Sequence, residues 1–174
     1  LTTLAFAPQT QNGIFAGIFV SLALFIYRRM RPNIEVLEPG SEALRSQAPE
    51  GARDTRLDAL GIVRFGASLV FVNASYFEDA VLRLERDYPG LRYVLVSANA
   101  INSLDASGVE MLSALVDGLR KKGIVVIFSG VKRHVRVVLE RTGLEARLGA
   151  DNFFESDAAA LQSLRKREAE LPGG

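Results

Sequence analysis

Two apolar runs that flank one amphipathic segment place the strongest constraint on how this chain folds. Residues 91–98 and 124–128 are rich in apolar side chains with little polar alternation, which is typical of strands covered on both faces. Between them, apolar residues recur at helical spacing over 109–119. A strand, a helix and a strand in this order predict a right-handed crossover between parallel strands.

The flanking sequence extends this unit into an α/β domain. Residues 60–65 and 69–72 predict two strands, and the short turn at Gly66 between them favours a hairpin. Apolar residues at helical spacing predict three further helices, in 75–88, 131–142 and 156–170. Phe153 and Phe154 are candidates for a short last strand. We expect a mixed sheet of four to five strands with about four helices packed mainly on one face.

The amino-terminal part differs from the rest of the chain in charge. Residues 1–27 carry no charged side chain, and 13–27 is an uninterrupted apolar run. Three arginines follow within four residues, and Pro32 then ends the segment. An apolar run followed by cations is typical of a transmembrane helix whose end faces the cytoplasm.

The run of 15 residues is shorter than the roughly 20 that cross a bilayer alone, so we compare three interpretations. A signal peptide places its positive charge before the apolar core, and here the charge follows it. A buried helix of a soluble protein is the second interpretation. We favour the end of one transmembrane helix, a polar turn at 8–12 and a last transmembrane helix at about 13–30.

The expected organisation has three parts. Residues 1–32 form the end of a transmembrane domain, 33–58 form a linker with an edge-strand candidate at 34–37, and 59–171 form the folded domain. Because residue 1 is not Met, we expect the chain to be a fragment of a longer protein.

Composition excludes several kinds of chemistry. The absence of cysteine excludes disulfides, thiol catalysis and cysteine-ligated metals. The single histidine, His134, lies between Arg133 and Arg136, which disfavour its protonation, so it is a poor base for a serine nucleophile. We therefore expect no catalytic residue, no metal and no cofactor. The net charge of +1 gives no reason to expect a nucleic-acid partner.

The polar turn after the first buried run is the main candidate for function. Asp105, Ser107 and Gly108 stand where the next helix begins, so they can form a cap, a switch or a partner surface. Ser107 with Glu110, like Ser75 with Glu78 earlier, has the spacing of a capping box. Asp105 either caps the helix or stays solvated, and Gly108 lets the chain pass close to a neighbour.

A second turn from strand to helix is a weaker candidate. Ser129, Gly130 and Lys132 follow the run 124–128, and amides at the start of a helix attract anions. The sequence contains no GxGxxG or GxxxxGK[ST] pattern, so we expect at most a weak anion or nucleotide contact at these residues.

These motifs resemble one family. A strand, then Asp-Ala-Ser-Gly-Val at 105–109, a helix, a glycine and a β-branched strand are similar to the STAS domain. Anti-sigma factor antagonists share this domain with the cytoplasmic tails of sulfate permease (SulP) transporters. Residues 63–77 are similar to the transporter version, with its pattern V-R-F … L-x-F-A-N-A-x-Y-F, and 13–32 resemble the last transmembrane helix of SulP proteins.

The resemblance implies the C-terminal fragment of a secondary transporter for sulfate, bicarbonate or a related anion. The anion would bind in a membrane domain outside this chain. The STAS domain would lie in the cytoplasm and serve in assembly, dimerisation and regulation, with a homodimer and a regulatory protein as partners. The parent would be a multi-pass protein of the cell membrane (the inner membrane in a bacterium), to which the N-terminal segment attaches this chain.

One position departs from the regulatory branch of the family. Anti-sigma factor antagonists are phosphorylated on the serine directly after the aspartate, and this chain has Ala106 there. We expect no phosphoswitch at 106, and a phosphate on Ser107 would be repelled by Asp105 and Glu110. A STAS regulator of the antagonist class with an unrelated anchor is the alternative function, and a small enzyme with a flavodoxin-like sheet is the third.

Overall fold

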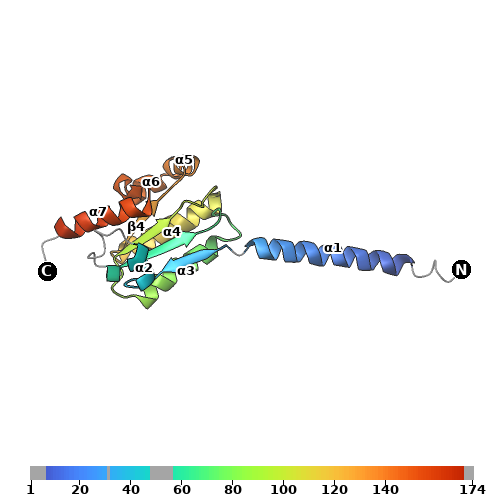
Figure 1. The fold of residues 1–174 in the computed structure, drawn as a ribbon. Coiled ribbons are helices and arrows are strands. Elements are labelled where there is room, and N and C mark those ends of the chain that lie inside the picture. The colour runs from blue at the N-terminus through green and yellow to red at the C-terminus, as the bar shows by residue number, and fades with distance from the viewer. Residues whose placement is uncertain (1–6, 31, 48–56, 171–174) are drawn as a thin grey trace. The chain divides into compact units, whose positions relative to one another are not determined.

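The computed structural model describes residues 7–30, 32–47 and 57–170, and the chain divides into two compact units, Leu1–Arg31 and Pro32–Gly174 (Figure 1). The described residues of the first unit, 7–30, form one helix, α1 (Ala7–Met30). This helix continues through 8–12, so the polar turn predicted there is wrong. Pro8 is compatible with the helix because it lies in the first turn, where its missing N–H would have no helical partner.

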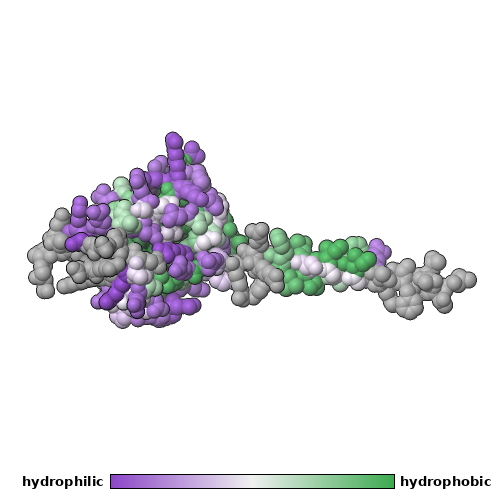
Figure 2. Space-filling view, in the orientation of Figure 1, coloured by the Kyte–Doolittle hydropathy of each residue, from purple (hydrophilic) through white to green (hydrophobic). Residues whose placement is uncertain are grey.

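The described surface of α1 is apolar, and Figure 2 shows it as a largely green helix. Ile14, Phe15 and Phe19 are each more than half exposed. Residues 13–30, predicted as a last transmembrane helix, are helical within α1, and their place in a membrane stays a prediction. Among the described residues, no helix has both the length and the hydropathy needed to cross a bilayer.

The second unit is built on a five-stranded sheet in the order β1-β2-β3-β4-β5. The strands are β1 (Ile34–Leu37), β2 (Leu60–Phe65), β3 (Tyr93–Ser97), β4 (Val125–Ser129) and β5 (Phe153–Phe154). Strands β2 to β5 run parallel, and β1 pairs antiparallel with β2. The structure confirms the predicted mixed sheet.

Helices cover both faces of this sheet. They are α2 (Glu42–Gln47), α3 (Ala74–Asp87), α4 (Ala106–Lys121), α5 (Arg133–Arg141), α6 (Leu144–Leu148) and α7 (Asp157–Glu170), with short 3-10 turns at Leu57–Ala59 and Ala150–Asn152. Helices α3 to α6 pack on one face, so most of the helical cover lies on one side, as predicted. Helices α2 and α7 cover the other face.

Burial on both faces explains the continuous apolar runs. In β3, Val94 and Val96 belong to the cluster beneath α3 to α6, whereas Leu95 belongs to the cluster beneath α7. In β4, Val126 belongs to the cluster beneath α3 to α6, and Ile127 belongs to the cluster beneath α7. Alternate residues of a strand point to opposite faces, so a strand between two helical layers needs apolar side chains at successive positions.

The predicted hairpin is wrong. Residues 69–72 do not pair with β2, and Leu69 instead forms an isolated parallel bridge with Leu104. The antiparallel neighbour of β2 is the edge-strand candidate at 34–37, which is β1. The buried Asn73 explains the loop, because its side chain accepts a hydrogen bond from the Val70 N–H at 2.9 Å and donates to the Ser68 carbonyl at 2.8 Å.

The region expected to be a linker contains a packed helix as well as β1. In α2, Leu44 is fully buried in the same cluster as Leu161 and Leu164 of α7. The Ser41 hydroxyl accepts a hydrogen bond from the Leu44 N–H at 3.2 Å. Residues 48–56 of the expected linker and the tail at 171–174 lie outside the described residues.

The packing of α7 gives a stability prediction. Leu164 is buried beneath α7, so Leu164→Ala should lower the free energy of unfolding by about 2–5 kcal/mol, because it removes apolar contacts and leaves a cavity. The exposed Gln162 on the same helix is the control, and Gln162→Ala should change stability by less than about 0.5 kcal/mol. Urea titrations of the full chain measure both. Equal effects of the two substitutions would contradict the packing of α7 on the sheet.

Candidate functional site

The loops that follow β2, β3 and β4 meet at the carboxyl ends of these parallel strands. We call this region, made by residues 66–73, 98–105 and 130–132, the carboxyl edge. The Leu69 N–H donates to the Ser103 carbonyl at 3.0 Å, which joins the first loop to the second. The Lys132 amino group donates to the Asn102 side-chain oxygen, which joins the third loop to the second.

Asp105 is the residue on which the carboxyl edge converges. One carboxylate oxygen accepts a hydrogen bond from the Phe71 N–H at 2.9 Å, and the other accepts from the Gly108 N–H at 2.8 Å. The Phe71 amide, followed by the Gly108 amide, lowers the pKa of Asp105, because both donate to the ionised form. Asp105 therefore caps α4 and also holds the loop that precedes α3.

Both predicted capping boxes are wrong. Helix α4 begins at Ala106, so Ser107 lies inside the first turn and Asp105 occupies the cap position. Helix α3 begins at Ala74, and its cap residue is Asn73. The Asn73 side chain bonds to the preceding loop and makes no cap hydrogen bond to α3.

Gly108 allows the close approach that the sequence predicts. A Cβ atom at this position would lie 2.6 Å from the Leu69 carbonyl oxygen and 2.9 Å from a methyl carbon of Leu104. Both distances are shorter than a van der Waals contact, so a side chain here would push α4 away from the loop. The glycine thus lets Asp105 reach the Phe71 N–H.

The held loop displays an apolar surface. The Phe71 side chain is 76% exposed although its N–H is fixed by Asp105, and the neighbouring Val72 is also exposed. An exposed aromatic ring on a backbone that is held in place can contact a partner with little loss of conformational entropy. The sequence reasoning missed Phe71 because it assigned residues 69–72 to a strand, in which an aromatic side chain is expected to be packed.

The three residues of the weaker candidate do not converge on one point. Ser129 is fully buried, and its hydroxyl donates to the Asp157 carboxylate. The Lys132 amino group donates to Asn102. A Cβ atom at Gly130, where φ is +64°, would overlap the Asn99 side chain. A carboxylate next to Ser129 opposes anion binding, so this geometry does not favour a phosphate contact there.

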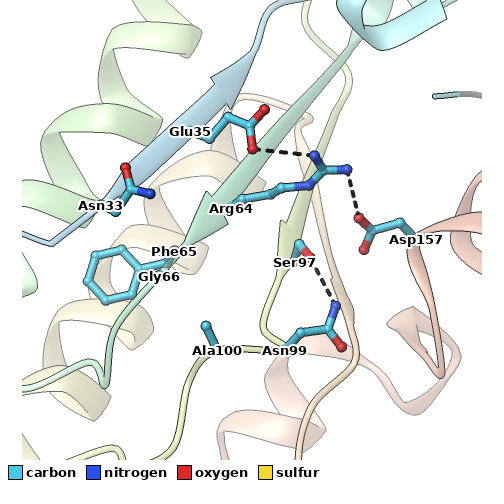
Figure 3. Close-up of a pocket in the computed structure, with 9 residues that line it drawn as sticks. All are labelled: Asn33, Glu35, Arg64, Phe65, Gly66, Ser97, Asn99, Ala100 and Asp157. Atoms are coloured by element: carbon cyan, nitrogen blue, oxygen red, sulfur yellow. Dashed lines mark hydrogen bonds and ion pairs between the residues drawn. The ribbon is translucent and has the colours of Figure 1, made fainter. Parts of the chain in front are cut away.

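A row of polar side chains crosses the α7 face of the sheet near the carboxyl edge (Figure 3). The Arg64 guanidinium lies between two carboxylates, 3.4 Å from Glu35 and 3.3 Å from Asp157. Asp157 also accepts the Ser129 hydroxyl, so one residue at the start of α7 ties β2 and β4 together. The row borders a hollow of about 390 Å³.

One sequence signal points to this row. Arg64 is the one charged residue in the apolar strand β2, and a charge in such a strand needs a partner. Its neighbours Glu35 and Asp157 come from 29 and 93 residues away, and no local pattern links them to Arg64. Arginine between two carboxylates is already neutralised, which suits a structural tie more than an anion site.

Comparison with known proteins decides the family. The model of the STAS domain matches residues 52–160. This chain belongs to the STAS domain family. The resemblance seen at 105–109 is thereby confirmed.

Similar proteins include sulfate transporters. The chain is 29% identical to probable sulfate transporter 4.2 of Arabidopsis thaliana, over 92% of this chain and 25% of that protein. It is 27% identical to a probable sulfate transporter of Mycobacterium tuberculosis, over 89% of this chain and 29% of that protein. The chain thus spans between a quarter and a third of the length of these relatives.

Solved structures share the fold. The murine Solute Carrier 26 family member A9 anion transporter aligns over 89% of this chain and 26% of its own, with a TM-score of 0.66 and 16% identity. A sulfate transporter family protein from Wolinella succinogenes aligns over 76% of this chain and 99% of its own, with a TM-score of 0.59 and 19% identity. A putative anti-sigma factor antagonist from Thermotoga maritima covers 62% of this chain and 89% of its own, with a TM-score of 0.53 and 16% identity.

The close approach at Gly108 gives a prediction with an internal control. In this STAS domain, Gly108→Ala should lower the free energy of unfolding by about 1–3 kcal/mol, because the new methyl group meets the Leu69 carbonyl. Gly118, exposed on the same helix, has nothing within 4 Å of its ideal Cβ. Gly118→Ala should therefore raise stability by about 0.5–1 kcal/mol. Urea titrations measure both, and a gain in stability from Gly108→Ala would contradict the geometry.

The lowered pKa of Asp105 gives a pH prediction. Because the folded state holds this pKa below its ordinary value of 3.8, the carboxylate's contribution is complete above 3.8 and is lost as the pH falls through the lower folded value. Asp105→Ala should cost about 1 kcal/mol near neutral pH, and the cost should shrink as acid protonates the native carboxylate. Urea midpoints from about pH 6 down to about pH 2 test this, with the change expected below 3.8.

Ser107→Ala is the control for Asp105→Ala, because it leaves the cap and the Phe71 contact in place. It should change stability by less than about 0.5 kcal/mol at every pH. A larger cost at Ser107 than at Asp105 would assign the cap to the serine and contradict the structure.

Proposed function

We propose that this chain is the STAS end of a SulP-type anion transporter, where it supports assembly and regulates transport without catalysing a reaction. The observation that carries the proposal is the extent of the likeness. The match to the Arabidopsis sulfate transporter covers 92% of the chain, which is more than the STAS model's residues 52–160. The anti-sigma factor antagonist covers 62%, so the part beyond the STAS domain favours the transporter over a separate regulator.

In this proposal the parent protein is a homodimer that crosses the membrane several times. Its anion site, for sulfate or a related anion, lies in the membrane domain outside this chain. The apolar surface of α1 suits packing against other apolar helices, and the STAS domain lies on the cytoplasmic side.

We place the regulatory contact of the STAS domain at the carboxyl edge. Asp105 and Ser107 are partly exposed there, the buried Gly108 packs beneath them, and Phe71 provides an exposed aromatic side chain whose N–H Asp105 holds in place. Aromatic residues with large exposed surfaces often supply much of the binding energy at an interface. Ala106 replaces the phosphorylated serine of the antagonists, so this contact depends on packing and not on phosphorylation at that position.

The test is sulfate uptake by the complete protein that contains this chain, reconstituted in proteoliposomes. Uptake of labelled sulfate should exceed that of empty vesicles. Phe71→Ser should lower the uptake rate by about fivefold, which corresponds to a loss of about 1 kcal/mol. Leu82 is also an exposed apolar residue, but it lies on α3 and not in the carboxyl edge. Leu82→Ser is therefore the control and should leave the rate unchanged.

Two different results would contradict two different parts of the proposal. Absence of uptake of sulfate and of other small anions by intact wild-type protein would refute the transporter function. Normal uptake by Phe71→Ser, in proteoliposomes that contain no other protein, would refute a regulatory contact of the carboxyl edge within the transporter itself and leave the transporter function standing. A regulator without transport would instead bind a soluble protein partner through the same residues.

A further inference from the structure

Within the described part of the chain, strand β1 pairs with β2 on one side and offers its other edge for pairing with a further strand. It lies at the end of the sheet order, with β2 as its neighbour among the described strands (Figure 1). The Gly66 N–H donates to the carbonyl of its register partner Asn33 at 2.8 Å. Hydrogen-bonded pairs alternate along an antiparallel ladder, so Ile34 and Val36 point their N–H and C=O groups away from β2.

A groove of about 420 Å³ runs beside this edge, between β1 and α3. Its floor is apolar, with Ile34 and Val36 from β1 and Ala80 and Leu84 from α3. The outward backbone groups of β1 therefore border a groove that can receive the side chains of an added strand. An extended peptide that pairs with a sheet edge uses main-chain hydrogen bonds for affinity and such pockets for specificity.

The walls of the groove select for positive charge. They contain the carboxylates of Glu38, Asp79 and Asp87, against the single guanidinium of Arg83. Asp87 also lies 3.5 Å from the Arg86 guanidinium, in an exposed pair of the kind that contributes little. The groove as a whole thus has an excess of negative charge.

Two tyrosines add to this preference. Tyr76 and Tyr88 line the same groove, and the faces of their rings attract cations. A hydrogen bond to the Glu38 carboxylate, which favours the protonated phenol, raises the pKa of Tyr88. A phenol is uncharged at neutral pH even at its ordinary pKa of 10.0, so Tyr88 adds no further negative charge.

We propose that this groove binds an extended segment of another protein, which adds a strand to β1 and places a lysine or arginine among the carboxylates. The groove-facing residues of this segment alternate between apolar, over the floor, and basic, at the walls. A second copy of this chain fits less well, because pairing of two β1 edges would bring two sets of the same carboxylates together. The proposal does not depend on the transport function.

The test uses the full chain and a synthetic peptide as the probe. The probe is fluorescein-labelled Thr-Val-Thr-Lys-Thr-Val-Thr-Lys, in which valine and lysine alternate on one face of a strand. One comparison peptide has glutamate in place of each lysine. A second carries N-methyl groups on alternate residues, which remove the N–H donors that strand pairing needs. Fluorescence anisotropy measures the binding of each peptide.

We expect the lysine probe to bind, with an affinity that falls as salt is added. The glutamate and N-methylated peptides should bind at least about tenfold more weakly, because each lacks one of the two kinds of contact. Asp79→Asn with Asp87→Asn should weaken binding of the lysine probe by about fivefold. Glu78→Gln, on the same helix but outside the groove, is the matched control and should have no effect.

Three results would overturn the proposal. The first is equal binding of the lysine and glutamate peptides. The second is full binding of the N-methylated peptide, which would show charge attraction without strand pairing. The third is a dimer of the chain, seen by sedimentation, that excludes the probe, because it would assign the groove to a second copy. The peptide comparisons leave the protein unchanged, so they do not depend on the folding of a variant.

Discussion

The two hydrogen bonds to the Asp105 carboxylate join parts of the STAS domain that are distant in sequence. One bond caps α4, and the other fixes the Phe71 N–H, 34 residues earlier in the chain. Both depend on Gly108, because any side chain there would strike the Leu69 carbonyl. The cap of α4, the conformation of the loop at Phe71 and the close contact at Gly108 thus depend on one another.

A second arrangement of this kind lies on the opposite face of the sheet. Arg64 is held between Glu35 and Asp157, and Asp157 also accepts the buried Ser129 hydroxyl. Partly exposed ion pairs add little net stability, but removal of one partner leaves the other charge uncompensated. The row therefore fixes where the start of α7 lies on β2 and β4. The apolar side chains beneath α7 supply most of the free energy that holds this helix on the sheet.

What the sequence could predict depends on whether the deciding interaction is local. Burial on both faces leaves a continuous apolar run, so β3, β4 and their crossover were predictable. Residues 69–72 have the same apolar character, but Asn73 and Asp105 hold them as a loop, and so the predicted hairpin failed. The sequence left two options for Asp105, which were to cap the helix or to stay solvated. The hydrogen bond from the Phe71 N–H helps to hold Asp105 as the cap, and no local pattern predicts this contact because it spans 34 residues.

The carboxyl edge and the groove beside β1 are connected by the start of α3. Only Val72 and Asn73 separate Phe71 from Ala74, where the helix begins, and Tyr76 then forms part of the groove wall. Asn73 is buried, and both the oxygen and the nitrogen of its side-chain amide form hydrogen bonds. These bonds hold the short connection in place. A protein that packs on Phe71 therefore contacts the segment that positions Tyr76.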